Sequence, residues 1–211
     1  MPRHDPSEKT KMEILTTAVR LFSEKGWENV NVEDVVKEVG VTRGAFYHYF
    51  KSREELVYAV MVQMFLDSNP YTVALRQEGL NAHEKLRFAF NLNQEMQTNP
   101  TLIKDLKKAF ESPVIFKSNL LMSVNEGSKF LEAIIEEGNK DGSMAVVHPK
   151  QTAQIMFVLF NAWLDIDIFK VSYDEYVEKV EFLIYFCNLL GLPDILGDFK
   201  EHFLKMYETY K

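Results

Sequence analysis

Hydrophobic positions recur with the period of an α-helix along almost the whole chain, and glycine and proline residues separate the periodic segments. The first segment predicts a helix from Thr10, which has capping-box spacing with Glu13, to Gly26. No segment shows the strict alternation of a half-buried strand. The pattern therefore predicts an all-α protein with about nine to ten helices.

Two short amphipathic segments follow, and the turn between them has helix-turn-helix spacing. Apolar residues repeat at i, i+3, i+4 and i+7 from Val32 to Val39. Gly40 suits the left-handed conformation at a sharp helix end, and Thr42 is a suitable N-cap for a second helix to about Tyr49. We therefore expect residues 1–53 to form a three-helix, DNA-binding helix-turn-helix head.

Residues 54–211 are expected to form a larger helical body for effector binding and dimerisation. Ser52 and Glu55 have capping-box spacing at the start of a helix toward Leu66, which joins head to body. Asn69-Pro70 and Gly79 are the expected break after it. Caps and breakers then delimit predicted helices at residues 82–98, 100–111, 114–138, 149–170, 173–190 and 195–210.

The second helix of the pair has two different faces when each residue is turned by 100° about the helix axis. The polar arc holds Arg43, Gly44, Tyr47 and His48, and the opposite, apolar arc holds Ala45, Phe46, Tyr49 and Phe50. Arginine matches guanine bidentately, glycine allows close approach, and tyrosine and histidine donate to phosphates or base edges. Any one of these residues alone is better explained by a solvated helix face than by DNA binding. The set, together with the turn, favours DNA.

The net charge of −7 does not exclude a nucleic-acid partner, because the acidity is unevenly distributed. Residues 1–53 carry nine Lys and Arg against eight Asp and Glu, and the other 15 basic and 23 acidic residues lie in the rest of the chain. Charges further apart than a Debye length of about 8 Å are screened at physiological salt. A local basic surface can therefore bind phosphates beside an acidic body.

These residues together resemble the tetracycline-repressor (TetR) family of transcriptional regulators over residues 10–60. The resemblance is carried by Ile14, Ala18, Leu21, Phe22, the run from Glu24 to Trp27, Val32, Val35, the run from Gly40 to Phe50, and the run from Ser52 to Leu56.

The resemblance implies DNA contacts for seven residues of the head. It implies that Thr42, Tyr47 and Lys51 contact phosphates, that Arg43 and Gly44 approach bases, and that His48 does either. Asn31 stands where the family usually has Thr or Ser, and because asparagine can also cap a helix, the same phosphate contact is implied for it. In addition to these seven, Arg3, His4 and Lys9, which precede the first predicted helix, are implied to follow the DNA backbone or minor groove.

Two body segments, residues 155–164 and 182–190, are apolar on nearly every side. Such a helix is either central in a core or shared with a partner. We expect a twofold four-helix contact between two copies, as is usual in the family, made by Phe160, Leu164, Phe182, Tyr185, Phe186 and Leu189. The alternative is a buried helix pair in a monomer. A dimer with recognition helices about 34–36 Å apart predicts a palindromic operator in double-stranded DNA.

An effector cavity is expected among the helices of residues 82–170. Its candidate lining residues are Phe88, Leu92, Met96, Phe110, Phe116, Met122, Phe130, Phe157, Asn161 and Trp163. Ligand pockets are mostly apolar with a few polar groups, but such stripes are more often plain core. Asp165 and Asp167 either neutralise a cationic effector or face solvent or an interface.

Other classes of function find little support. Cys187 is the single cysteine, so we expect neither an internal disulfide nor a thiolate metal site, and the histidines lack metal-ligand spacing. We find no catalytic motif and expect no enzyme activity, cofactor or metal. No apolar run reaches the about 18 residues of a membrane span, and the N-terminal segment is polar, so we expect a soluble cytoplasmic protein without a membrane partner.

The sequence thus predicts a ligand-responsive DNA-binding regulator. The expected form is a homodimeric repressor that a small-molecule effector releases from a palindromic operator. The alternative mode of regulation is that the protein activates transcription, or that the effector strengthens its binding to DNA. The alternative from another class is an architectural or cell-division DNA-associated protein on the same scaffold, without a small ligand.

Overall fold

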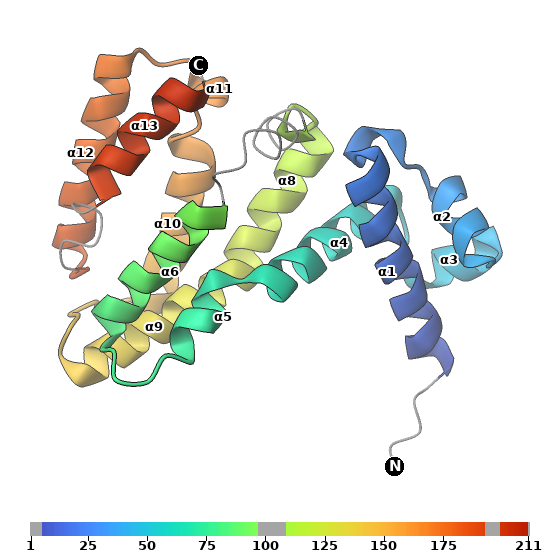
Figure 1. Ribbon diagram of the computed structural model, residues 1–211, viewed down its shortest axis with the longest axis horizontal. Helices are drawn as coiled ribbons and strands as arrows, with labels where there is room; N and C mark the ends of the chain where they lie inside the picture. Colours follow the sequence, from blue (N-terminus) through green and yellow to red (C-terminus); the bar gives the residue numbers. More distant parts are fainter. Residues whose placement is uncertain (1–5, 97–108, 193–198, 211) are drawn as a thin grey trace. The chain divides into compact units, whose positions relative to one another are not determined.

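The computed structural model describes residues 6–96, 109–192 and 199–210, and every regular element within these ranges is helical. The described residues form two compact units (Figure 1). The first unit runs to Ser68 and includes residues 109–122, and the second holds residues 69–96 and those from Ser123 onward. The all-α prediction is confirmed.

The first unit begins with α1 (Pro6–Lys25) and a short 3-10 turn, η1 (Trp27–Asn29). The helix pair α2 (Val32–Val39) and α3 (Arg43–Tyr49) comes next, then α4 (Arg53–Ser68) and, after the gap, α8 (Pro113–Met122). α1 packs against α2 and α4, and α8 packs against α4. The shared core contains Ile14, Phe22, Val35, Phe46 and Val57.

The predicted start of the first helix at Thr10 is wrong, because the chain is already helical from Pro6. Proline is favourable in the first helical turn, where its missing N–H would have no partner and its fixed φ suits the helix. Residues 7–9 are polar and give no apolar period. Periodicity therefore locates the packed part of α1 but not its beginning.

The turn between α2 and α3 has the geometry that its residues predict. Gly40 adopts a left-handed conformation, with φ 80° and ψ 24°, and its N–H donates to the Val36 carbonyl at 3.0 Å. The Thr42 hydroxyl oxygen accepts from the Ala45 N–H at 3.1 Å and starts α3. Local hydrogen bonds thus fix both ends of the turn.

The second unit contains α5 (Pro70–Leu75), α6 (Ala82–Met96), the π-helical turn η2 (Ser123–Gly127) and α9 (Ser128–Asp141). It continues with α10 (Pro149–Val158), a second π-helical turn η3 (Leu159–Trp163), and the short α11 (Ile166–Phe169). α12 (Tyr173–Leu189) and α13 (Lys200–Tyr210) complete it and pack on each other. Its core includes Leu86, Ile134, Met156 and Leu183.

One predicted break and two predicted helices of the body differ from the observed structure. Asn69-Pro70, predicted as a break, starts α5 instead, because the Asn69 side chain accepts from the Tyr71 N–H at 2.9 Å. The helices predicted at 114–138 and 149–170 contain η2 and η3, and the second ends near Leu164 before α11. Most of the helix predicted at 100–111 lies outside the described residues.

A partly buried ion pair and a cap join α6 to α9. Lys85 is almost fully buried, and its Nζ lies 2.5 Å from Oε1 of Glu137. The Asp141 carboxylate accepts from the Ala82 N–H at 2.9 Å. Hydrogen bonds from Ser143 and from Ala82 hold the pKa of Asp141 below its usual value. No helix within the described residues is both long and apolar enough to cross a membrane.

Candidate DNA-binding site

Two buried phenylalanines anchor α3 to the rest of the first unit. Phe46 and Phe50 have almost no exposed surface, and their ring centroids lie 5.8 Å apart. Ala45 and Tyr49 are half-buried on the same side. The apolar arc predicted from the sequence is therefore the packed back of α3, and this fixes the direction in which the other arc points.

The polar arc faces outward. Arg43, Gly44, Tyr47 and His48 are all exposed, and 38% of the Tyr47 surface is accessible. A β-carbon built on Gly44 would meet only the Thr42 hydroxyl oxygen, at 3.9 Å. The protein itself thus leaves room for a larger residue at this position. No contact within the fold requires the side chain to be missing, so its absence gives room to a molecule that approaches α3 from outside.

The N-caps of α2 and α3 keep hydrogen-bond donors beside this surface. Asn31 forms a capping box with Asp34, in which Asn31 Oδ1 accepts from the Asp34 N–H at 2.9 Å and the Asp34 carboxylate accepts from the Asn31 N–H. Capping engages the acceptor oxygens of Asn31 and Thr42, whose side-chain amide and hydroxyl groups can still donate. Such donors are suited to phosphate oxygens.

Lys51 lies at the other end of α3. Its Nζ lies 3.2 Å from the Tyr47 carbonyl oxygen and 3.1 Å from that of His48, so its ammonium group donates to the C-terminal carbonyls of the helix. The positive charge is favourable at the negative end of the helix dipole. The Ser52 hydroxyl oxygen accepts from the Glu55 N–H at 3.2 Å and caps α4. Lys51 is thereby held beside the outward face of α3.

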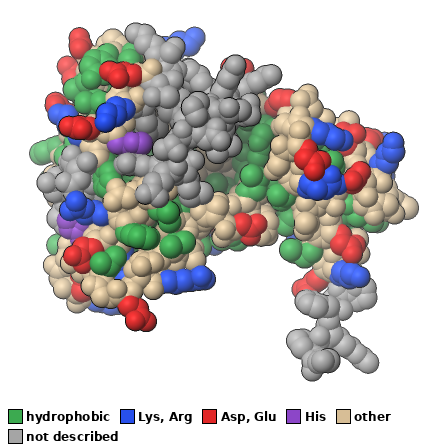
Figure 2. Space-filling model, in the orientation of Figure 1, with side chains coloured by type: hydrophobic (Ala, Val, Ile, Leu, Met, Phe, Trp, Pro, Cys, Tyr) green, Lys and Arg blue, Asp and Glu red, His purple; other side chains and the backbone are tan. Residues whose placement is uncertain are grey.

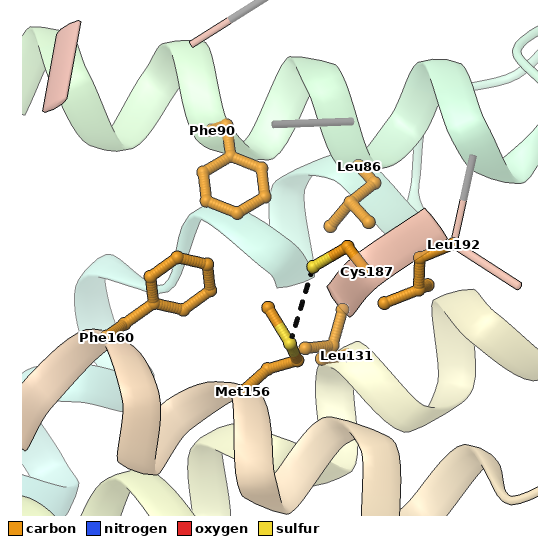
Figure 3. Close-up of a pocket in the computed structure, with 7 residues that line it drawn as sticks. All are labelled: Leu86, Phe90, Leu131, Met156, Phe160, Cys187 and Leu192. Carbon is orange, nitrogen blue, oxygen red and sulfur yellow. Dashed lines mark hydrogen bonds between the residues drawn. The ribbon is translucent and has the colours of Figure 1, made fainter. Parts of the chain in front are cut away.

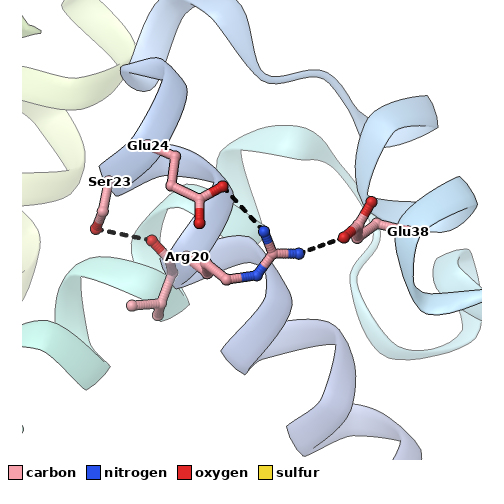
Figure 4. A network of polar contacts seen from close by, with 5 residues as sticks. Arg20, Ser23, Glu24 and Glu38 are labelled. Carbon is pink, nitrogen blue, oxygen red and sulfur yellow. Dashed lines mark hydrogen bonds and ion pairs between the residues drawn. The ribbon is translucent and has the colours of Figure 1, made fainter.

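Two arginines of the head are paired with carboxylates of α2. Arg43 lies 2.9 Å from Glu33, and both side chains are exposed. Arg20 of α1 contacts Glu24 at 2.9 Å and also pairs with Glu38 (Figure 4). The hydrogen bonds that the Arg20 guanidinium donates to Glu24 and Glu38 raise its pKa. Figure 2 accordingly shows Lys, Arg, Asp and Glu side chains mixed on the visible face of the head.

The residues predicted for a dimer contact divide between the surface and the core of the second unit. Phe182, Tyr185 and Leu189 lie one turn apart on α12 and expose 51%, 63% and 68% of their surface. Phe186 is half-buried, and Phe160 is half-buried between Phe90 and Phe203. Leu164 belongs to the core and offers almost no surface to a partner.

The π-helical turn explains the position of Leu164. In η3 the Leu164 N–H donates to the carbonyl of Leu159, five residues earlier, at 3.0 Å. A turn that holds more than 3.6 residues rotates the subsequent side chains away from the positions that a regular helix gives them. After Leu159, the side chains therefore point in directions different from those that a regular α-helical period predicts.

One small apolar cavity lies within the described part of the second unit, and none of the ten predicted effector-contacting residues lines it. Its walls are Leu86, Phe90, Leu131, Met156, Phe160, Cys187 and Leu192 (Figure 3). Cys187 Sγ lies 3.6 Å from Met156 Sδ, and burial raises the pKa of the thiol to about 12. The thiol therefore stays protonated at neutral pH.

The predicted effector-contacting residues are dispersed over both units. Phe110, Phe116 and Met122 lie in the first unit, with Met122 buried in its core. In the second unit, the lining residues of α6 are Leu86 and Phe90, whereas Phe88 and Leu92, both half-buried, were predicted. The side chain of Met96 lies outside the described residues. The two sets are offset by two residues, which is about 200° around the helix, so the predicted residues lie on nearly the opposite face of α6 from the lining ones. Apolar residues occupy both faces, and the helical period alone therefore does not distinguish them.

The remaining predicted residues have structural contacts of their own. Phe157 is buried against Tyr71, with ring centroids 5.9 Å apart, and Asn161 donates to the Phe157 carbonyl at 2.8 Å. Trp163 lies 5.1 Å from the Lys179 ammonium, and Phe130 is half-buried. Asp165 caps α11 by accepting from the Ile168 N–H at 3.0 Å. The described residues contain no group of three or more His, Cys, Asp or Glu side chains arranged to hold a metal ion.

Comparison with known proteins gives matches to regulators. Residues 14–60 match the family of bacterial regulatory proteins, tetR family. YuxN of Bacillus subtilis (strain 168), an uncharacterised HTH-type transcriptional regulator, is 41% identical over 54 residues. That match covers 26% of this chain and only 18% of YuxN. The HTH-type transcriptional repressor NemR of Escherichia coli (strain K12) is 23% identical over 196 residues, which are 88% of this chain and 96% of NemR.

A solved structure extends the likeness to the whole fold. The structure of RolR in complex with resorcinol has a TM-score of 0.60 and 17% sequence identity, and the match covers 92% of this chain and 93% of RolR. The matched sequence segment contains α2, α3 and their turn, which carry the outward polar face and the buried aromatic back of the candidate site. The part of the chain that carries the helix-turn-helix therefore matches the tetR family of bacterial regulatory proteins.

Proposed function

We propose that this protein is a homodimeric transcriptional repressor that binds a palindromic operator and is released from it by a small-molecule effector. The observation that carries the proposal is the orientation of α3. Phe46 and Phe50 fix the helix from behind, and Arg43, Gly44 and Tyr47 face outward. A helix with these side chains fits the major groove, where arginine can pair with guanine.

Dimerisation is supported by the outer face of α12. Phe182, Tyr185 and Leu189 form an exposed apolar row, and Ile155 of α10 is exposed as well. Monomeric proteins rarely expose a large contiguous apolar patch, and a twofold contact would cover the same row on both copies. Two copies present two heads, so that the operator has two related half-sites.

The repressor assignment is supported by relatives, and the effector by the body. NemR is named a transcriptional repressor and resembles this chain over most of its length. RolR, whose fold is similar, binds resorcinol in its crystal structure. The cavity of the second unit is apolar, so an effector that enters it is neutral and must displace flexible side chains such as Met156. Release requires that the effector bind the DNA-incompetent conformation more tightly.

The first experiment is selection of duplexes from a random DNA pool by the purified protein. A repressor of this kind enriches one palindromic sequence with two half-sites. In vivo, it then occupies a few promoters. Enrichment of no sequence, or occupancy at many dispersed sites, would contradict the proposal and favour an architectural DNA-associated protein.

The selected operator then allows a test of the recognition helix. Arg43→Ala is expected to relax base preference at one position in each half-site, at a cost of about 1–3 kcal/mol. Lys51→Ala is expected to weaken binding to all sequences alike and to reduce the slope of log affinity against log salt by about 1. Fluorescence anisotropy on cognate and scrambled duplexes measures both. Equal losses on the two duplexes for Arg43→Ala would contradict its base-reading role.

A further inference from the structure

We infer that Glu33 is a positioning residue that determines how selectively Arg43 reads DNA. The inference rests on the proposed function, because it assumes that Arg43 approaches bases. It assigns a role to an acidic residue on the face that binds a polyanion, where a carboxylate by itself opposes binding.

The two residues meet across the helix-turn-helix bend. Glu33 lies in the first turn of α2, and Arg43 is the first residue of α3. Oε1 of Glu33 lies 2.9 Å from a terminal guanidinium nitrogen of Arg43, with 55% and 64% of the side chains exposed. The pair therefore lies at the surface, on the same side as the outward face of α3.

Both backbone segments that carry the pair are fixed by their own caps. The Asn31 capping box holds the first turn of α2, and the Thr42 hydroxyl oxygen holds the first turn of α3. Gly40 sets the bend between them. The position from which Glu33 reaches Arg43 is therefore set by local structure, and only the two side chains remain to be ordered.

The chemistry of the guanidinium allows Glu33 and a base to be bound together. Arginine has five N–H donors, and a bidentate contact to guanine uses two of them. The Glu33 carboxylate can accept from one guanidinium N–H group while other N–H groups of Arg43 remain available to the base. An arginine ordered in advance loses less rotamer freedom when it binds, and a tethered arginine reaches fewer phosphate oxygens in a wrong register. Both effects favour the cognate site over other sequences.

The chain offers a matched control on the same helix. Glu38 also lies on α2, is similarly exposed, and is paired with an arginine, but its partner is Arg20 of α1. Glu33→Gln and Glu38→Gln therefore remove the same charge from α2 and break the same kind of exposed pair. Only the first releases Arg43.

The experiment measures the affinity ratio between the selected operator and a duplex changed at the base pair that Arg43→Ala relaxes. Glu33→Gln is expected to lower this ratio about two- to fivefold, the range of an exposed ion pair, and to strengthen binding to scrambled DNA. Glu33→Asp keeps the charge but shortens the reach. It is expected to lower the ratio and to strengthen binding to scrambled DNA less than Glu33→Gln does, because the negative charge remains. Glu38→Gln is expected to leave the ratio unchanged.

A double-mutant cycle with Arg43→Ala completes the test. In that background Glu33→Gln is expected to have no further effect on the ratio, because the residue it positions is gone. Circular dichroism melts check that each variant is folded. An unchanged ratio in Glu33→Gln, an equal loss in Glu38→Gln, or a loss that persists without Arg43 would each overturn the inference. A wild-type protein that prefers no duplex would instead overturn the proposed function, and the inference with it.

Discussion

At the scale of single residues, the burial of the apolar side chains of α3 determines which of its residues are exposed. Phe46 and Phe50 are buried, and the residues on the opposite arc must then face solvent. The stability of the fold does not explain why residue 44 is a glycine. A glycine within a helix is destabilising by about 0.5–1 kcal/mol relative to alanine, and the space around this one is open.

Gly44→Ala is therefore expected to change stability and DNA binding in opposite directions. The free energy of unfolding should rise by about 0.5–1 kcal/mol, because alanine is the better helix former. Affinity for the operator should fall, because the added methyl group lies on the face that is proposed to approach the bases. Chemical denaturation and fluorescence anisotropy measure the two effects. Operator binding as tight as that of the wild type would show that α3 does not approach DNA closely at Gly44.

At the scale of elements, the bend between α2 and α3 depends on the left-handed conformation of Gly40. A β-carbon there would meet no atom within 4 Å. Any cost of a side chain at this position is therefore a backbone cost, without a steric clash to add to it.

Gly40→Ala is expected to destabilise the head by about 1–2 kcal/mol, the cost of the left-handed conformation for an L-residue. Urea denaturation measures this loss. Gly44→Ala is the matched control, because the same atoms are added to a right-handed helical position in the same motif. If both substitutions raise the stability, the bend does not require a left-handed conformation in solution.

The packing of α13 makes a prediction about pH. Burial, with a smaller contribution from Lys205, lowers the pKa of His202 below its usual 6.5. The unfolded chain then binds a proton more readily than the folded one. Stability is expected to be full above the usual pKa and to fall as the pH drops from there toward the folded pKa. Thermal melts at about pH 7.5 and about pH 5.5 measure the change, and His202→Gln should reduce the difference between them. A pH dependence that is unchanged in the variant would assign it to other groups.

At the scale of the whole molecule, the proposed function requires two heads, and the exposed row on α12 is the surface proposed to bring them together. Tyr185 lies in the middle of the row, between Phe182 and Leu189. A charge placed there would have to be buried without a partner in the dimer but would be solvated in the monomer.

Tyr185→Glu is therefore expected to shift the protein from dimer to monomer in sedimentation experiments. Affinity for the two-half-site operator should then fall about 100-fold or more, because the second head loses its effective concentration. Val147→Glu is the control, because Val147 is an apolar residue with 82% of its surface exposed that lies outside this row. A Tyr185→Glu protein that stays dimeric would move the subunit contact elsewhere.

The head was largely predictable from the sequence because local interactions specify it. Val32 to Val39 repeat with a helical period, Gly40 ends their helix, and Thr42 begins the next. Each of these signals depends on hydrogen bonds and burial within a few residues. The rotation of α3 was predictable as well, because Phe46 and Phe50 lie on one arc and can be buried together without burying the polar arc.

The body was predictable as helices but not as surfaces. α6 and α10 carry apolar residues on several faces, so their period does not say which face meets a cavity, a neighbouring helix or another copy. The π-helical turn at Leu159–Trp163 then shifts the register of the residues after it, and Leu164 lies in the core. The Arg43–Glu33 pair was missed for a similar reason, since it joins residues on two helices across a bend.

The sequence alone determined the helical class, the helix-turn-helix and the outward face of α3, because periodicity, caps and a glycine in the bend act over one or two turns of chain. The tertiary structure decided which apolar residues line the cavity, which row of α12 stays exposed, and which carboxylate holds Arg43. Those outcomes depend on the packing of segments far apart in the chain, where several faces are equally apolar and only the fit between helices selects one.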